Sequence, residues 1–150
     1  RPGAPRRTTS YGGASHRDWP AQAVSRSALR HADVENARPG EDGPVPGDLV
    51  WAWVPYGRSP GDGKDRPCAV VARKPDRGSV LAVPLTSREH DDDGDYLFLG
   101  YGDWNADGPA SWAHVSVLLR ISEHGIRSIH GRLDGLQLRA LRSVLRIRVR

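Results

Sequence analysis

The sequence predicts a mainly β fold of small-barrel size with one helix at its C-terminal end. Short runs rich in β-branched and aromatic residues recur between residues 46 and 121. Glycine, proline and aspartate separate these runs, which is the pattern of short strands joined by turns. One stretch with helical spacing of its leucines follows, over residues 134–146. These observations favour a single small domain built around a sheet.

Residues 1–45 differ in composition from the rest of the chain. They are rich in Arg, Pro, Gly, Ser and Ala and hold few sizeable apolar side chains. Because so little apolar area can be buried, folding would not offset the entropy of ordering this stretch. We therefore expect residues 1–45 to form a disordered basic N-terminal extension and residues 46–150 to form the domain. The extension could be inert or an arm that touches nucleic acid.

Four strands are expected in the first part of the domain. A turn signal at Pro46-Gly47-Asp48 opens it, and the runs that follow place strands at 48–54, 66–73, 79–85 and 96–99. The glycine-rich segment 56–64 should be an exposed, mobile loop. The acidic segment 91–95 lacks the distal glutamate of an EF-hand calcium loop, so it is interpreted as a solvated loop.

Residues 111–121 are expected to form a fifth strand, because its side chains separate onto two faces. The members of the two faces are Ala113, Val115, Val117 and Leu119 on one, and Trp112, His114, Ser116 and Leu118 on the other. Only the second face carries groups that could bind or catalyse.

The helix begins at Asp134, and Gln137 three residues on completes a capping box. Its leucines cover one broad side, and the arginines that include Arg139 and Arg142 should point outward. The whole chain has a net charge of +4, and residues 120–150 carry eight arginines against two acids. Such a basic end suits a polyanion by counterion release, and a solvated helix face is the alternative.

The single cysteine, Cys68, excludes an internal disulfide and a cysteine-based zinc site. It lies in an apolar run, which favours a small buried hydrophobe over a nucleophile. No apolar stretch has the length of a membrane span or a secretory signal. We therefore expect a soluble, cytoplasmic protein with no membrane partner.

Several common chemistries lack their signatures in this chain. There is no Walker loop, no Gly-x-Gly-x-x-Gly after a strand, no His-Glu-x-x-His and no Gly-x-Ser-x-Gly. Cations, hydroxyls and one proton-transfer group remain, namely Lys64, Arg66, Thr86, Ser87, His114 and Ser116. This set suits a phosphodiester. Because RNA can be cut by its own 2′-hydroxyl, neither a metal nor a cofactor is expected.

Each of these residues also has a structural interpretation. Arg66 could pair with the neighbouring Asp65 at the surface, and Thr86 and Ser87 could simply end a strand. His114 could be a packed strand histidine. Trp112 could stack on a base, as aromatic platforms do for single-stranded nucleic acid, or shield the edge of a core or fill a dimer interface.

The order of the motifs is more specific than any one of them. Pro46-Gly47-Asp48-Leu49-Val50-Trp51 comes first, then Gly63-Lys64-Asp65-Arg66-Pro67 before Cys68-Ala69-Val70-Val71, then Pro84-Leu85-Thr86-Ser87, and last Gly131-Arg132-Leu133-Asp134. In this order residues 46–146 resemble the MazF/PemK (Kid-like) toxins of type II toxin–antitoxin systems. The resemblance implies a small SH3-like β-barrel with a closing helix and a homodimer. It also implies metal-independent endoribonuclease activity on single-stranded RNA and neutralisation by a cognate antitoxin.

The resemblance also implies roles for single residues. Arg66 falls where the family has its catalytic arginine, and Thr86 where it has its catalytic threonine. Kid-like members place Arg and Asp two residues apart on a late strand, where this chain has Trp112 and His114. His114 would then replace the carboxylate as the base. The family's Gly-x-Glu-Gln before the Arg-Pro pair is also absent, since the loop here ends in Lys64.

On this interpretation Arg66, Thr86 and His114 are catalytic. Lys64 steers the RNA backbone, and substrate contacts also come from Ser87, Trp112 and Ser116. Two other functions remain open on the same fold. One is a CcdB-like inhibitor that poisons DNA gyrase, and the other is an inactive SH3-like module that binds RNA or a peptide.

Overall fold

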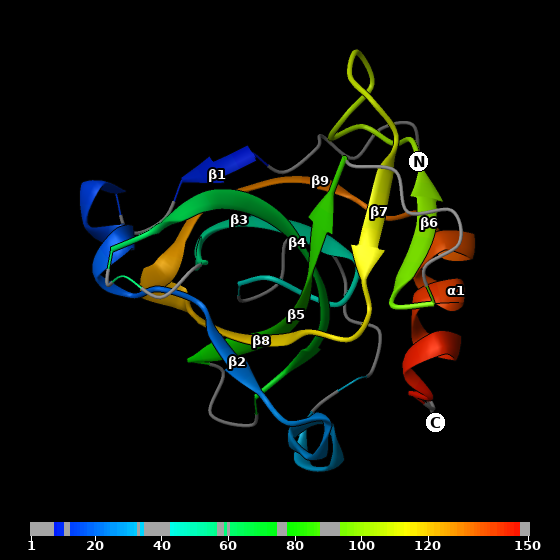
Figure 1. Cartoon of the computed structure of the whole chain (residues 1–150), viewed down its shortest axis with the longest axis horizontal. Coiled ribbons are helices and arrows are strands. Elements are labelled where there is room, and N and C mark those ends of the chain that lie inside the picture. Colours follow the sequence, from blue (N-terminus) through cyan, green and yellow to red (C-terminus); the bar gives the residue numbers. More distant parts are fainter. Residues whose placement is uncertain are drawn as a thin grey trace.

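The computed structural model describes residues 8–10, 13–32, 34, 43–56, 59, 61–74, 78–87 and 94–147. It is a mainly β structure with one C-terminal α-helix, as the sequence predicts (Figure 1). The strands are β1 (Thr8–Ser10), β2 (Gln22–Val24), β3 (Asp48–Pro55), β4 (Gly63–Arg73), β5 (Ser79–Thr86), β6 (Tyr96–Gly100), β7 (Ser111–His114), β8 (Leu118–Ser122) and β9 (Ile126–Arg132). The helix is α1 (Gly135–Leu145), and short 3₁₀ helices cover Gly13–Asp18 (η1), Arg26–His31 (η2) and Glu123–Gly125 (η3).

The described strands pair antiparallel in the order β1-β9-β3-β4-β5-β7-β6, and β8 pairs with both β2 and β5. The sheet curls strongly, but its ladder does not close on itself (Figure 1). The expected fold class is confirmed, with a strongly curled sheet in place of a closed barrel. The sheet branches at β5, which pairs with β8 along its first half and with β7 at its end.

The strand expected over residues 111–121 is in fact two strands. Leu85 pairs with Ala113, whereas Ala82 pairs with Leu119. Between these two pairs β5 advances by three residues, whereas the segment that contains β7 and β8 advances by six. The extra length forms a turn at Val115 and Ser116. Because the turn interrupts the alternation, the two expected faces do not extend past His114. Leu118 and Leu119 are both buried, since they face the two different cores.

No strand is expected from the sequence at residues 126–132, where the structure has β9. This strand pairs with β3 through two register shifts. Its buried isoleucines, Ile126 and Ile129, are three residues apart rather than two. The bulges therefore remove the alternation by which a strand is recognised in a sequence.

Two apolar cores lie on the two faces of the sheet. On one face Leu138, Leu141 and Leu145 of α1 pack with residues such as Leu81 and Val83. On the inner face the second core consists of Ala21, Val50, Ala52, Val54, Cys68, Val70, Val80, Ala82, Leu119, Ile121, Ile126 and Ile129. Residues 68–71 of β4 and 80–83 of β5 alternate between the two cores, which explains why both stretches are continuously apolar.

The motifs at residues 46–48 and 131–134 meet in the structure. Asp48 is buried, and its carboxylate accepts hydrogen bonds from Val45 N at 3.0 Å and from Arg132 Nη1 at 3.0 Å. Gly131 has a φ of +96°, and a Cβ there would lie 2.7 Å from Asp103 Oδ1. These residues hold the start of the domain against the entry to α1, so their part in the motif pattern is structural.

Helix α1 has the expected capping box. The Asp134 carboxylate accepts from Gln137 N at 2.7 Å, and Gln137 Oε1 accepts from Asp134 N at 2.9 Å. Arg142 is a correction, because it is buried rather than turned to solvent and donates to Val34 O at 2.8 Å. Burial, together with the charge of Arg132, lowers the pKa of the Arg142 guanidinium.

The expectation of disorder is wrong for the described part of residues 16–32. β2 pairs with β8, Ala21 is buried in the inner core, and the Trp19 ring contacts the His124 ring with centroids 4.9 Å apart. A few specific contacts and a shared ladder thus order a stretch whose composition is poor in apolar residues. The rest of the expected extension at 1–7, 11–12, 33 and 35–42 lies outside the described residues, as does the acidic run 91–93.

Candidate functional site

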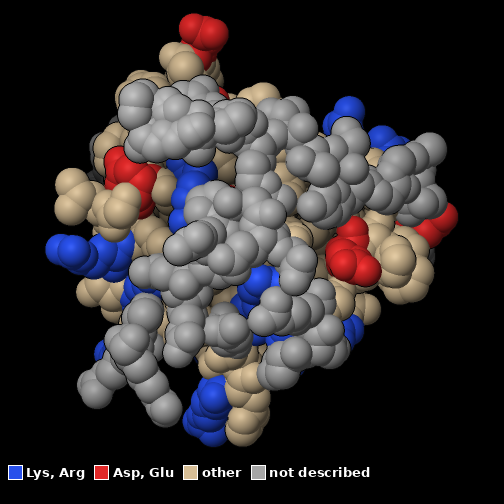
Figure 2. All heavy atoms as spheres, turned by 180° about the vertical axis from the view of Figure 1, so that it is seen from behind, with Lys and Arg blue, Asp and Glu red and all other residues tan. Residues whose placement is uncertain are grey.

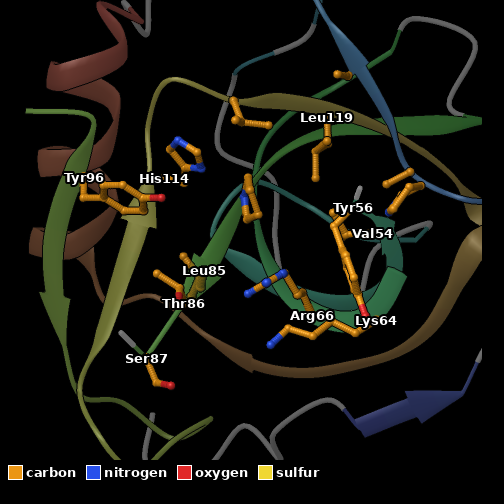
Figure 3. Close-up of a pocket in the computed structure, with 15 residues that line it drawn as sticks. Val54, Tyr56, Lys64, Arg66, Leu85, Thr86, Ser87, Tyr96, His114 and Leu119 are labelled. Carbon is orange, nitrogen blue, oxygen red and sulfur yellow. The ribbon is translucent and has the colours of Figure 1, made fainter. Parts of the chain in front are cut away.

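A groove of about 910 Å³ opens at one end of the inner face of the sheet. Figure 3 shows Tyr96 beside His114 at one side of it, with Arg66 and Lys64 at another. Its lining residues are Ala21, Ala23, Val54, Pro55, Tyr56, Lys64, Arg66, Pro84, Leu85, Thr86, Ser87, Tyr96, His114, Val117 and Leu119. Five of the seven residues singled out in the sequence therefore meet in one place.

Strand register brings Arg66 and Thr86 together. Cys68 on β4 pairs with Pro84 on β5. Arg66 lies two residues before Cys68 and Thr86 two residues after Pro84, so both lie just beyond this end of the ladder. Both lie on the inner side of the sheet, because Cys68 and Ala82 on the same alternation belong to the inner core. Lys64 continues the series on β4 toward the mouth of the groove.

Asp65 does not neutralise Arg66, although the two are neighbours in sequence. Alternation turns Asp65 to the outer side of β4, where its carboxylate contacts His16 Nε2 at 2.7 Å and Arg127 Nη1 at 3.0 Å. Arg66 is half-buried, and the Asp65 carboxylate is engaged by His16 and Arg127 instead. The described lining thus holds two cations and no carboxylate, which suits an anionic ligand.

His114 occupies the side of the groove formed by β6 and β7. It pairs with Tyr96 across these strands, and the two rings stack with centroids 4.3 Å apart and an interplanar angle of 14°. Leu85 pairs with Ala113, so the same register places His114 beside Pro84, two residues from Thr86. An imidazole, a guanidinium and hydroxyl groups therefore line one surface.

Trp112 and Ser116 do not lie where the sequence analysis expects them. Trp112 is 8% exposed and contacts Phe98 edge to face at 4.9 Å, so its ring is not presented to a base. Ser116 lies in the turn between β7 and β8, where it donates to Asp95 Oδ1 at 2.6 Å. Neither residue lines the groove, because Phe98 on β6 covers Trp112 and the turn after His114 redirects Ser116.

Comparison with protein families gives a match over residues 45–149 to the family described as PemK-like, MazF-like toxin of type II toxin–antitoxin system. The chain belongs to this family. Among solved structures, it is similar to an endoribonuclease in complex with its cognate antitoxin from a mycobacterial species. The TM-score is 0.52 at 15% identity, over 69% of this chain and 91% of that chain, so the likeness is one of fold. Comparison with curated protein sequences gives no match.

The groove of this PemK/MazF family member contains groups that the sequence analysis missed. Tyr96 opens β6 and is recognisable only once β6 is paired with β7. Tyr56 follows Pro55 at the end of β3 and is 56% exposed. Ala23 comes from β2 and Ala21 immediately precedes it, in a stretch that the family match does not cover. Long-range pairing, which the sequence analysis did not specify, places all four.

One other potentially reactive group of the toxin, the thiol of Cys68, lies outside the groove. Cys68 is fully buried, and burial raises the pKa of its thiol to about 12, so it is no nucleophile at neutral pH.

No three His, Cys, Asp or Glu side chains gather to hold a metal among the described residues. No helix within those residues is long and apolar enough to cross a membrane. On the face seen from behind, basic and acidic side chains are interspersed (Figure 2).

Proposed function

We propose that this MazF-like toxin is an endoribonuclease that cleaves single-stranded RNA through its own 2′-hydroxyl, without a metal ion. The supporting observation is the gathering of Lys64, Arg66, Thr86, Ser87 and His114 around one groove whose described lining lacks a carboxylate. The match to the toxin family and the fold shared with an endoribonuclease agree with this proposal.

The chemistry follows from what each group can do. Neutral His114 takes the proton of the 2′-hydroxyl, and the 2′-oxygen attacks the adjacent phosphorus. The bond from phosphorus to the 5′-oxygen breaks, and the imidazolium returns its proton to that oxygen. The products are a 2′,3′-cyclic phosphate and a 5′-hydroxyl, so atoms and charge balance.

The other residues act on the charge that builds up on the phosphoryl oxygens. The Arg66 guanidinium grips two of these oxygens in a planar fork. Thr86 and Ser87 donate hydrogen bonds to the same oxygens, and such preorganised donors act mainly on the transition state. Lys64, near the start of β4, holds the phosphate backbone of the RNA.

We further propose that a cognate antitoxin relieves the growth inhibition caused by this activity, that the toxin works as a homodimer and that it acts in the cytoplasm. The structurally similar endoribonuclease was solved with its own antitoxin. Gyrase poisoning and inactive binding remain alternatives on this fold, and the RNA assay below separates them, because neither yields cut RNA.

The test is Arg66→Ala in an assay on a mixed pool of single-stranded RNA with analysis of the product ends. We expect cleavage to be lost, the thermal unfolding midpoint to stay within a few degrees, and wild-type products to carry cyclic phosphates even in excess EDTA. Arg139→Ala, an exposed arginine on α1 outside the groove, is the matched control and should cut normally. Undiminished cleavage by Arg66→Ala would refute the assignment, and an inert wild type would refute the nuclease.

His114→Gln tests the base separately. A positioned base contributes about 10²–10⁴-fold to the rate, so the variant should slow cleavage by that factor. In the wild type the cleavage rate should rise with pH as the imidazole loses its proton. In His114→Gln this rise should be absent. His130→Gln, an exposed histidine on β9 outside the groove, should retain the wild-type pH profile. A normal profile in His114→Gln would assign the base to another group.

A further inference from the structure

One wall of the groove comes from outside the part of the chain that matches the toxin family. The family match spans residues 45–149, whereas Ala23 of β2 and Ala21 just before it line the groove. With Val117 and Leu119 they give the groove an apolar part. Val54, which also lines the groove, pairs with Lys64 across β3 and β4, so the apolar part adjoins the cations Lys64 and Arg66.

The N-terminal segment that supplies this wall, residues 16–31, is held by specific contacts. Gln22, Ala23 and Val24 pair with Arg120, Leu119 and Leu118 on β8. Ala21 N donates to Trp53 O at 2.9 Å. His16 contacts the Asp65 carboxylate at 2.7 Å, and the Arg17 guanidinium lies 4.2 Å from the centroid of the Trp53 ring. β2 thereby covers the edge of β8 beside the groove (Figure 1).

The domain is shaped to receive the segment at Gly125. A Cβ at this position would lie 2.3 Å from the carbonyl oxygen of Trp19, and its three nearest atoms would all belong to Trp19. The Trp19 ring also contacts the ring of the neighbouring His124 in a tilted arrangement. The close approach of the segment therefore depends on a residue without a side chain in the family-matched part of the chain.

We propose that the N-terminal segment forms the wall of a subsite for one nucleobase and so determines which base the toxin accepts there. This rests on the proposed nuclease function. A base is flat, uncharged and apolar on its faces, and it stacks on surfaces of this kind. Alanine side chains leave the subsite open, while the cationic part of the groove takes the phosphates.

The test compares cleavage sites across a pool of single-stranded RNA of random sequence, read by sequencing the product ends. Ala23→Leu narrows the subsite at an exposed position, so preference at one position of the cleavage motif should shift about tenfold toward pyrimidines. Gly125→Ala displaces Trp19 and should relax preference at that same position. Faster tryptic cleavage after Arg26 or Arg30 reports that displacement independently of activity.

Two matched controls leave the wall intact. Gln22→Leu makes the same kind of change on the adjacent β2 residue, whose side chain turns to Arg120. Gly135→Ala adds a methyl where nothing lies within 4 Å. Both should keep the wild-type motif. RNA cut at an unchanged motif by Ala23→Leu overturns the inference and leaves the nuclease standing, whereas an inert wild type overturns both. If Gly125→Ala keeps the segment docked, Ala23→Leu alone decides.

Discussion

Asp65 and Arg66 are sequence neighbours with opposite surroundings, because successive side chains of a strand face opposite sides of the sheet. Asp65 joins His16 and Arg127 on the outside, while Arg66 faces the groove. The pair with Arg127, whose side chain is 58% exposed, adds under about 1 kcal/mol to stability. The pair matters because it holds the Asp65 carboxylate on the outer side of the sheet, away from Arg66.

Thr86 is a residue whose contribution can be isolated by an isosteric change. Thr86→Val keeps the shape and removes the hydroxyl, so we expect the cleavage rate to fall by about 10²–10³-fold, as for the loss of one preorganised donor. Thr86→Ser keeps the hydroxyl and should retain most of the activity. The rates are measured on one fluorescent oligonucleotide under single-turnover conditions. Equal rates for the valine and serine variants would remove Thr86 from the mechanism.

Cys68 gives a prediction about stability against pH. Burial raises the pKa of its thiol from 9.0 to about 12, so the folded protein keeps a proton that the unfolded chain releases in this range. The unfolded state then binds fewer protons, and the free energy of unfolding falls between pH 9 and 12, by about 1.4 kcal/mol per pH unit from this group. Below pH 9 the contribution is constant.

Urea unfolding of the wild type and Cys68→Ala from pH 8 to 11 tests this. Lysines and tyrosines titrate in both proteins, so the difference between the two curves reports the thiol. The wild-type free energy should decline more steeply above pH 9. Parallel curves would show that the thiol titrates alike in both states.

The secondary-structure elements show which local signals are sufficient. The strands expected at 48–54, 66–73, 79–85 and 96–99 correspond to β3 to β6 within a few residues. They were recognisable because each is a compact run bounded by turn residues. β7 and β8 were merged, and β9 was absent from the analysis, since a turn and two register shifts disturb the alternation there.

The cap of α1 gives a prediction at the level of one element. Asp134→Ala removes the carboxylate that accepts from Gln137 N, and such a loss costs about 1 kcal/mol. Asp134→Asn retains an acceptor oxygen and should cost only a few tenths. The measurement is the urea concentration at the unfolding midpoint, compared between variants whose free energy of unfolding has the same slope against urea concentration. Equal midpoints for the alanine and asparagine variants would show that the cap contributes nothing.

At the scale of the whole molecule, the curled sheet separates two tasks. One face packs on α1, and the inner face forms a core that opens into the groove at one end. The groove is thus an extension of the inner core, with Val54 and Leu119 belonging to both. A rigid apolar floor of this kind fixes the side chains that project beside it.

The charge of the groove predicts how binding depends on salt. Each phosphate neutralised on a single strand adds about 0.7 to the slope of log affinity against log salt. Lys64→Ala should therefore weaken binding of an uncleavable 2′-deoxy strand at low salt and reduce that slope by about 0.7. Arg139→Ala, exposed on α1, should leave the slope unchanged. Fluorescence anisotropy at several salt concentrations measures both, and an equal slope in Lys64→Ala would place Lys64 outside the phosphate path.

The sequence by itself determined the mainly β class, the single helix with its cap, and the series Lys64, Arg66, Thr86, Ser87 and His114, because turns, caps and short motifs are local. Only the tertiary structure decided that these side chains share one groove, that Trp112 is covered, and that residues 16–31 form a wall. Those outcomes depend on which strands pair and in which register. Pairing is set by contacts between residues far apart in the chain, which the sequence analysis did not specify.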